Sequence, residues 1–379
     1  MKKITVLALS FLLLVGLFGC SVKIDSDVFV KIGADYEQAK DFSEGLAAVK
    51  KNGLWGFINA GGDQVVDFRF EDAWSFREGV AAVRENGLWG YITPDGAWVI
   101  EPQFEQTWFF SSGMAVIKQG SSYGYIDRSG TVVIAPQYQD AGDFNGQIAY
   151  VKKESKYGFI NPQGEIVSDF QWIEGRTMRE GLIEVFDSDL SGFINEEGIL
   201  VIPLSIPDAG YFSEGYAAAQ NSSLKWGFID AKGEFVIEPK WNYVGDFHEG
   251  LAIAMTEKYA GYINTAGETV IKEQYLHAYD FSCGLARVAS DSEGIGTQWG
   301  FINANGETVV SFSYGAAQDF SEGYAAVCQN GKWGVISADG TVVIKPSYEE
   351  ISPVSEGILR LKKSGKWAFA KLKDGAVQN

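Results

Sequence analysis

The dipeptide Trp-Gly recurs along the chain at a nearly constant interval, and this period constrains the fold more than any other feature of the sequence. Successive copies are separated by 34, 34, 34, 34, 35, 34, 39, 34 and 34 residues. The ten copies, some of them degenerate, begin at Trp55, Trp89, Tyr123, Tyr157, Ser191, Trp226, Ala260, Trp299, Trp333 and Trp367. Such a period predicts a row of similar supersecondary units, each packed against its neighbours.

Each unit is predicted to contain three short antiparallel strands. The first begins at a glycine and ends before a turn that often reads Asn-Gly, as at Asn52 and Gly53, which favours a two-residue hairpin. The second strand reads Trp-Gly-aromatic-Ile. A type I turn with a left-handed glycine is indicated by pairs such as Asn59 and Gly62. The third strand often carries a proline, as at Pro102, which predicts an edge or a bend because proline donates no hydrogen bond.

The second strand is apolar on both of its faces. The residue after the glycine is aromatic in every unit except the one with Val335, and the next residue is isoleucine in every unit except the one with Ala370. Adjacent residues of a strand point to opposite faces, so neighbouring units must cover this strand on both sides. We expect the glycine to make room for a ring of another unit.

The period, the Trp-Gly-aromatic-Ile strand, the turn glycine and the Val-Ile-x-Pro-x-Tyr strand together resemble the WG-repeat family of bacterial proteins. The resemblance covers nearly all of the chain beyond the first 27 residues. It departs from the pattern at Ser191 and Ala260, and the unit from about Asp169 to Pro207 is half-degenerate. The resemblance implies a β-rich repeat module, and it implies neither catalytic residues nor a single ligand.

The two ends of the array leave two architectures open. The segment from Val28 to Tyr36 resembles a third strand, whereas the last unit stops after Phe369 without one. Pairing of these ends would close a ring and remove an unpaired edge, but ten units would leave a very wide opening. We predict an all-β array of about ten 34-residue, three-stranded antiparallel repeats in an open curved superhelix. A closed, propeller-like toroid is the alternative.

The N-terminal segment is typical of export and anchoring. Two lysines precede an almost unbroken apolar run of about fifteen residues, which matches a secretory signal and is short for a membrane-spanning helix. The run ends in Leu-Phe-Gly followed by Cys20, which resembles the lipobox of bacterial lipoproteins. We predict a signal peptide over residues 1–19, lipidation of Cys20 with a short tether over 20–27, and the repeat domain over 28–379.

Composition narrows the location and the class of partner. The net charge of −18 argues against nucleic-acid binding, because phosphate neutralisation needs clustered Lys and Arg. Three cysteines are too few for a disulfide scaffold, and Cys283 and Cys328 leave either a disulfide or two free thiols open. We expect an exported protein that is lipid-anchored to a membrane of the bacterial envelope, with its repeats outside the cytoplasm. Inner and outer membrane both remain open.

The sequence offers no constellation that carries chemistry. His248 and His277 lie in different units at positions that are polar elsewhere, so both are expected to face solvent. Metal-binding and phosphate-binding motifs are missing from the sequence. An aspartate recurs before phenylalanine, which is more typical of a turn device than of a general acid. Its copies are Asp41, Asp143, Asp246, Asp280 and Asp319. We therefore expect no enzymatic activity, no catalytic residue, no metal and no cofactor.

Aromatic residues that depart from the repeat are the better candidates for ligand contact. Trp74 and Trp108 occupy the same place in successive units, and Trp98 lies in the same two units. If exposed, they would form a ring-stacking surface for a glycan or a protein; if buried, they are local changes of the core. The main expectation is a non-catalytic interaction scaffold of the cell envelope for a protein or cell-wall partner. The alternative is a carbohydrate- or peptidoglycan-binding accessory protein that uses these tryptophans.

Overall fold

The computed structural model describes residues 26–174, 176–292 and 296–373. The predicted signal peptide, Cys20 and the tether as far as residue 25 lie outside the described residues. The described part of the chain consists of strands, turns and connections. It contains no helix with the length and apolar character needed to cross a membrane.

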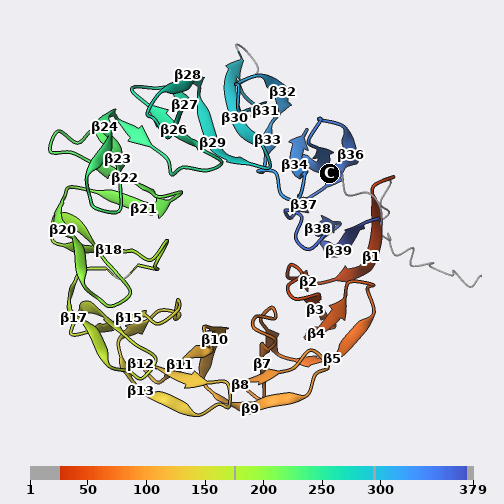
Figure 1. The fold of residues 1–379 in the computed structure, drawn as a ribbon. Helices are drawn as coiled ribbons and strands as arrows, with labels where there is room; N and C mark the ends of the chain where they lie inside the picture. The colour runs from red at the N-terminus through yellow and green to blue at the C-terminus, as the bar shows by residue number, and fades with distance from the viewer. Residues whose placement is uncertain (1–25, 175, 293–295, 374–379) are drawn as a thin grey trace, which may run out of the picture.

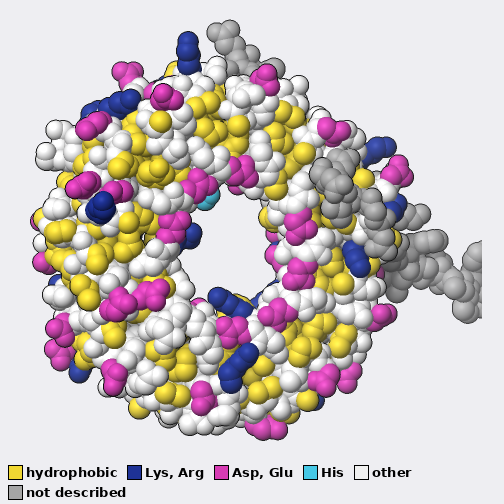
Figure 2. Space-filling model, in the orientation of Figure 1, with side chains coloured by type: hydrophobic (Ala, Val, Ile, Leu, Met, Phe, Trp, Pro, Cys, Tyr) yellow, Lys and Arg dark blue, Asp and Glu magenta, His cyan; other side chains and the backbone are white. Residues whose placement is uncertain are grey.

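The strands form ten antiparallel sheets that stand like blades around a central opening (Figure 1). In each blade the strands follow one another outward from the opening. The space-filling view shows that the opening passes through the ring and is bordered by both acidic and basic side chains (Figure 2). The protein is a ten-bladed β-propeller. The predicted all-β array of ten repeats is therefore confirmed, whereas the open superhelix is wrong and the closed toroid is correct.

The strand bounds follow blade by blade. Blade 1 contains β2 (Gln38–Ala39), β3 (Leu46–Lys51), β4 (Leu54–Asn59) and β5 (Gln64–Phe70). Blade 2 contains β6 (Asp72–Ala73), β7 (Ala81–Glu85), β8 (Leu88–Ile92) and β9 (Trp98–Phe104). Blade 3 contains β10 (Gln106–Ser111), β11 (Met114–Gln119), β12 (Ser122–Asp127) and β13 (Val132–Tyr138). Blade 4 contains β14 (Asp140–Ala141), β15 (Ala149–Lys153), β16 (Lys156–Ile160) and β17 (Ile166–Trp172). Blade 5 contains β18 (Ile183–Asp187), β19 (Leu190–Ile194) and β20 (Leu200–Ile206).

The second half of the ring continues in the same way. Blade 6 contains β21 (Ala209–Ser213), β22 (Tyr216–Gln220), β23 (Trp226–Ile229) and β24 (Phe235–Trp241). Blade 7 contains β25 (Tyr243–Val244), β26 (Leu251–Met255), β27 (Ala260–Asn264) and β28 (Thr269–Tyr275). Blade 8 contains β29 (His277–Ser282), β30 (Leu285–Ser292), β31 (Gly296–Asn303) and β32 (Thr308–Tyr314). Blade 9 contains β33 (Ala316–Ala317), β34 (Tyr324–Gln329), β35 (Lys332–Ser337) and β36 (Val342–Tyr348). Blade 10 contains β37 (Glu350–Ile351), β38 (Ile358–Lys363), β39 (Lys366–Leu372) and β1 (Phe29–Tyr36).

Most blades have one strand more than the three that the sequence predicts. The additional strand is the innermost one, and in blade 1 it is only the two residues Gln38–Ala39. A strand of this length is too short to show an alternating pattern, which is why the repeat did not reveal it. Within the described residues blade 5 has three strands, in keeping with its degenerate sequence.

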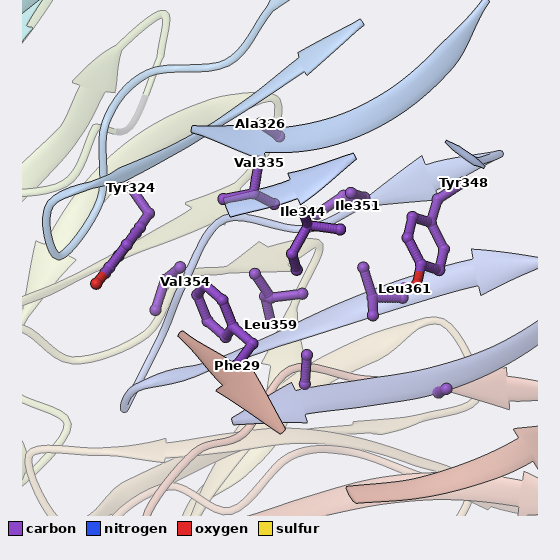
Figure 3. Packing of buried hydrophobic residues seen from close by; sticks show 12 residues of the cluster. Phe29, Tyr324, Ala326, Val335, Ile344, Tyr348, Ile351, Val354, Leu359 and Leu361 are labelled. Atoms are coloured by element: carbon purple, nitrogen blue, oxygen red, sulfur yellow. The ribbon is translucent and has the colours of Figure 1, made fainter. Parts of the chain in front are cut away.

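The ring is closed by β1, which forms the outer strand of the last blade. It pairs antiparallel with β39 from the Phe29–Leu372 pair to the Tyr36–Trp367 pair, and so supplies the strand that the last unit lacks. The side chain of Phe29 is buried between Val354 and Leu359 (Figure 3). The open superhelix would leave this strand and the outer edge of β39 unpaired, which explains why closure is preferred.

The core of the protein lies between the blades rather than within a single sheet. One face of each blade carries large, mostly aromatic side chains and packs against a mixture of small and large apolar side chains of the next blade. Between blades 1 and 2, the large set is Trp55, Phe57, Val66 and Phe70, and the facing set is Ala73, Phe76, Ala81, Val83 and Ile92. At the closure, Tyr36, Trp367 and Phe369 of blade 10 pack in the same way against Ala39, Ala47 and Val49 of blade 1. The prediction that both faces of the second repeat strand are covered is confirmed, since Phe57 and Ile58 are both buried.

The glycine of Trp-Gly faces the backbone of its own unit. In blade 2 the strand pairs shift from Trp89–Phe104 to Tyr91–Ile100, so a bulge of β9 lies opposite Gly90. A Cβ on Gly90 would lie 2.4 Å from the carbonyl oxygen of Ile100 and 2.8 Å from the nitrogen of Pro102. The prediction that this glycine makes room for a ring of another unit is therefore wrong. The predicted edge position of the proline is confirmed, because Pro102 lies in a bulge of an outermost strand.

The turns divide the ring into two faces. The turns between the first and second strands of the blades, such as Glu44-Gly45, lie on one face, which we name the Glu-Gly face. The opposite face, named the connection face, carries turns such as Asn52-Gly53 and the links between blades. The two residues Asn52 and Gly53 have φ values of 53° and 80°, so the predicted hairpin turn is confirmed. Gly62 has a φ of 88° and donates to the Asn59 carbonyl at 2.9 Å, which confirms the predicted type I turn.

Carboxylates on the Glu-Gly face connect each turn to the next blade. Glu356 is held at a φ of 54°, a left-handed conformation that costs about 1 kcal/mol for a residue with a Cβ. Its two carboxylate oxygens accept from the backbone N–H groups of Glu44 at 2.7 Å and Gly45 at 2.9 Å. Glu322 holds the turn of blade 10 in the same way. These bonds cross the blade interfaces and, through Glu356, the closure itself.

We expect Gly90→Ala to destabilise the protein by about 1–3 kcal/mol, because its Cβ would overlap backbone atoms that cannot move independently. Chemical denaturation followed by circular dichroism measures the change. Gly315→Ala is the matched control, since a Cβ on Gly315 would meet only one atom within 4 Å, at 3.9 Å. Equal stability of the two variants would contradict the proposed role of the bulge.

We expect Glu356→Ala to lower Tm by several degrees, because two charge-assisted hydrogen bonds across the closure are lost. Cys283→Ala is the control, since Cys283 occupies the equivalent turn position at the same φ of 54° but has no carboxylate. Both variants keep the same backbone strain, so the difference between their Tm changes, measured by calorimetry, reports the lost hydrogen bonds alone. A Tm change in Glu356→Ala no larger than that in Cys283→Ala would exclude a role for the carboxylate links.

Candidate functional site

A hollow of about 340 Å³ opens on the connection face between blades 2 and 3. Two of the three predicted tryptophans line it: Trp74 follows β6, and Trp108 lies in the equivalent strand β10. The complete lining is Trp74, Arg84, Trp89, Glu105, Gln106, Thr107 and Trp108. The repeat thus places the two tryptophans of successive units around one site, together with the repeat tryptophan Trp89, which belongs to the buried core between these blades.

The rings at the hollow form a connected aromatic group. Trp74 stacks on Trp89 with ring centroids 6.4 Å apart and an interplanar angle of 28°. Phe109 of blade 3 meets the Trp74 ring edge-on at 5.3 Å, and Trp108 lies 5.7 Å from Tyr123. On the side of blade 1, the ammonium of Lys40 lies 4.1 Å from the centroid of Trp74. Burial lowers the pKa of Lys40, and the nearby Asp72 opposes this shift.

Buried hydrogen bonds hold the hollow in shape. The Tyr91 hydroxyl donates to the backbone carbonyl of Trp108 at 2.7 Å and also contacts the hydroxyl of Thr107. Thr107 in turn donates to the carbonyl of Val116 at 3.0 Å. Burial raises the pKa of Tyr91, so its hydroxyl stays protonated and available as a donor. Tyrosine in place of the usual phenylalanine at position 91 is a sequence signal that was missed.

Trp98 does not belong to the hollow. It begins the outer strand β9, at the end of that strand nearer the Glu-Gly face, and meets Phe70 of blade 1 edge-on at 5.8 Å. The guanidinium of Arg69 lies 5.6 Å from its ring centroid. The structure therefore separates Trp98 from the two tryptophans with which the sequence grouped it.

A second aromatic surface lies on the connection face of blades 7 and 8, across the central opening from the hollow (Figure 1). Its exposed rings are Tyr243, Tyr259 and Tyr279. Among the described residues, these three are the large aromatic side chains that are exposed to solvent. His277 stacks on Trp299 with centroids 5.8 Å apart and planes 14° apart. The guanidinium carbon of Arg287 lies 3.7 Å from the Tyr279 centroid. We refer to Tyr243, Tyr259, Tyr279, His277 and Trp299 as the tyrosine surface.

The recurring aspartates lie at the blade interfaces. The Asp41 carboxylate is paired with Arg360 of the preceding blade, and Asp319 is paired with Arg287 at 2.9 Å. Asp280 lies 3.5 Å from the imidazole of His248. These contacts agree with a structural role for the aspartates. Among the described residues, no group of three or more His, Cys, Asp or Glu side chains is arranged to hold a metal ion.

The two cysteines lie in the neighbouring blades 8 and 9, toward opposite faces of the ring. Cys283 is exposed in a turn of the Glu-Gly face, whereas Cys328 pairs with Trp333 on β34, toward the connection face. Both are free thiols. Of the two alternatives that the sequence left open, the structure therefore shows two thiols rather than a disulfide.

Blade 5 contains a buried ion pair where the repeat tryptophan is replaced by serine. The Glu184 carboxylate pairs with Arg176 and accepts a hydrogen bond of 2.9 Å from the hydroxyl of Ser191. Burial raises the pKa of Glu184 to about 8, although Arg176 and Ser191 act in the opposite direction. Sequence reasoning missed this pair, yet Ser191 and Glu184 both depart from their repeat positions and are a usable signal.

We expect the burial of the Glu184 carboxyl group to make stability depend on pH. The pKa of Glu184 is higher in the fold than its ordinary value of 4.5, so its contribution is fully present below that value and is lost as the pH rises toward about 8. Glu184→Gln should therefore show a flatter Tm profile between pH 5 and 9 than the wild type. The control is Glu174→Gln, at an exposed carboxylate 3.7 Å from the same arginine. Parallel profiles for Glu184→Gln and the wild type would contradict the raised pKa.

Solved structures resemble this chain at low sequence identity. A crystal structure of a eukaryotic initiation factor is 8% identical, with a TM-score of 0.52 over 86% of this chain and 98% of that chain. BamB from Moraxella catarrhalis is 12% identical, with a TM-score of 0.37 over 91% of this chain and 100% of that chain. Hsv2 from Kluyveromyces lactis is 11% identical, with a TM-score of 0.34 over 72% and 98%. The likeness to the initiation factor concerns the fold alone. No curated protein sequence matches significantly.

A family model described as the WG containing repeat matches the chain ten times. The matches cover residues 30–55, 55–89, 89–121, 123–157, 157–186, 192–223, 226–259, 261–292, 299–333 and 333–367. They follow the period of the Trp-Gly dipeptides and extend over most of the ring. The chain therefore belongs to the WG-containing repeat family.

Proposed function

We propose that this protein is a non-catalytic binding scaffold of the bacterial envelope, held at a membrane through Cys20 and contacting a protein or cell-wall partner with its connection face. The observation that carries the proposal is the tyrosine surface. Tyr243, Tyr259 and Tyr279 are exposed by 50%, 41% and 41%, and all three belong to neighbouring blades on one face.

The composition of this surface suits a binding contact. Tyrosine, tryptophan and arginine dominate the energetics of protein interfaces, because they bury a large area at a small cost in side-chain entropy. Arg287 is already held by Asp319 and lies over the Tyr279 ring, so little of its freedom remains to be lost on binding. The side chains of Arg287 and Tyr279 would therefore be ordered before a partner binds.

The entry point of the chain supports the choice of face. Lys373 donates to the Val28 carbonyl and Leu372 to the Gly357 carbonyl, both at 2.8 Å, so the described chain begins beside a turn of the Glu-Gly face. Cys20 precedes Ser26 by six residues, which span at most about 20 Å when extended. A lipid on Cys20 would hold the Glu-Gly face near the membrane and leave the connection face for a partner.

The proposal is tested with the full chain in two binding experiments. One is affinity capture of partners from detergent-solubilised envelopes, and the other is a pulldown of the protein on purified wall polysaccharide. We expect the triple variant Tyr243→Ala, Tyr259→Ala and Tyr279→Ala to lose at least about ten-fold in partner recovery, which two or three interface rings can supply. The control is the triple variant Val132→Ala, Ile166→Ala and Val342→Ala, which removes exposed apolar groups from outer strands.

Two outcomes would overturn parts of the proposal. Full recovery of the partner by the tyrosine variant would exclude the tyrosine surface as the contact. Cys20→Ala should move the protein from the membrane fraction to the soluble fraction without loss of its partner, and retention in the membrane would exclude the lipid tether.

A further inference from the structure

We infer that the hollow between blades 2 and 3 is a subsite for a neutral pyranose ring of a cell-wall glycan. The inference rests on the proposed function in that it names the ligand chemistry at one part of the connection face. It uses Trp74, Trp89 and Trp108, and it leaves Trp98 out.

The half-buried rings of Trp74 and Trp108 suit the apolar face of a sugar, while Trp89, which is only 8% exposed, supports the ring of Trp74. Trp74 and Trp89 stack on each other at 28°, while Trp108 borders the hollow from the next blade. An indole offers a flat, polarisable surface against which the C–H groups of a pyranose pack. The volume of about 340 Å³ lies at the lower end of the range of about 300–1,000 Å³ that is typical of small-molecule sites. One or two sugar rings are therefore the appropriate size.

The polar groups of the hollow favour a neutral ligand with many hydroxyl groups. The Glu105 carboxylate already accepts from the backbone N–H of Gly120 at 2.8 Å. The guanidinium of Arg84 lies 3.6 Å from the carboxylate of Glu71. Arg84 is thus already paired with a carboxylate, whereas Glu105 keeps its negative charge and is held in place by a backbone hydrogen bond, so an anionic ligand would meet repulsion from Glu105 and no free cation at Arg84. Hydroxyl groups can donate to Glu105 and accept from Arg84 and the Gln106 amide.

The site is ordered before any ligand arrives. Tyr91 holds the Trp108 carbonyl at 2.7 Å, and the ammonium of Lys40 lies over the Trp74 ring. Fixed rings lose little conformational freedom on binding, which favours affinity for a rigid sugar. The Nε1–H group of Trp74 is buried and has no hydrogen-bond acceptor among the described residues, at a cost of about 1–3 kcal/mol.

Calorimetric titration of the full chain in detergent, with cellohexaose and chitohexaose as probes, tests the inference. We expect binding of at least one probe, and a loss of at least about ten-fold in affinity for Trp108→Ala. Trp98→Ala is the matched control, because it removes a half-buried tryptophan of blade 2 that lies outside the hollow. Its affinity should equal that of the wild type.

A second measurement does not depend on the stability of a variant. In wild-type protein labelled with 5-fluorotryptophan, the bound probe should shift the ¹⁹F resonances of Trp74, Trp89 and Trp108 and leave that of Trp98 in place. Single Trp→Phe variants assign the resonances. This pattern places the sugar in the hollow even if Trp108→Ala fails to fold.

Several results would overturn the inference. These are no binding of either probe, an equal loss of affinity in Trp98→Ala, or ¹⁹F shifts confined to tryptophans outside the hollow. If no sugar binds but an envelope protein is still captured through the tyrosine surface, only the sugar subsite is excluded and the scaffold function remains. If the tyrosine variant also captures its partner normally, both proposals fail.

Discussion

The packing of an aromatic face of each blade against a mixed apolar face of the next blade is the interaction on which the ring depends. Each blade offers residues such as Trp55 and Phe57 on one side and residues such as Ala47 and Ile58 on the other. A single blade can bury neither face, because a lone sheet has no second layer of its own. An open array would leave one face of each kind exposed at its ends. Closure through β1 and β39 joins these two faces, so the tenth interface repeats the other nine.

This arrangement separates positions that build the ring from positions that are free to vary. Positions shared by the units face the blade interfaces, where a change affects two blades at once. Departures from the repeat collect on the innermost strands and at the connection face, where Trp74, Trp108 and Tyr279 are found. Trp74 and Trp108 of the hollow and the three tyrosines of the tyrosine surface are such departures, whereas Trp89 and Trp299 belong to the repeat. Ser191 with Glu184 shows that a departure can also be absorbed inside an interface, by replacing an indole with an ion pair.

Much of the fold could be predicted because the repeat shows its own alternation and turn chemistry. Asn52-Gly53 and Asn59 to Gly62 specify their turns locally, through residues that adopt positive φ or accept from nearby N–H groups. The inner strand at Gln38–Ala39 could not be predicted, because two residues show no pattern. Of the candidate site, Trp74 and Trp108 were identified from their equivalent positions. Trp98 was grouped with them wrongly, because sequence spacing does not show whether a residue lies on an inner or an outer strand.

The sequence by itself determined the number of repeats, their all-β character, most of their turns and the family to which they belong, because each of these is encoded within one period of 34 residues. Only the tertiary structure decided between a ring and a superhelix, since the pairing of Phe29 with Leu372 joins residues at opposite ends of the chain. It also decided which aromatic side chains share a surface. Both outcomes depend on the small rotation from blade to blade, and this angle accumulates around the ring without leaving a pattern in any single repeat.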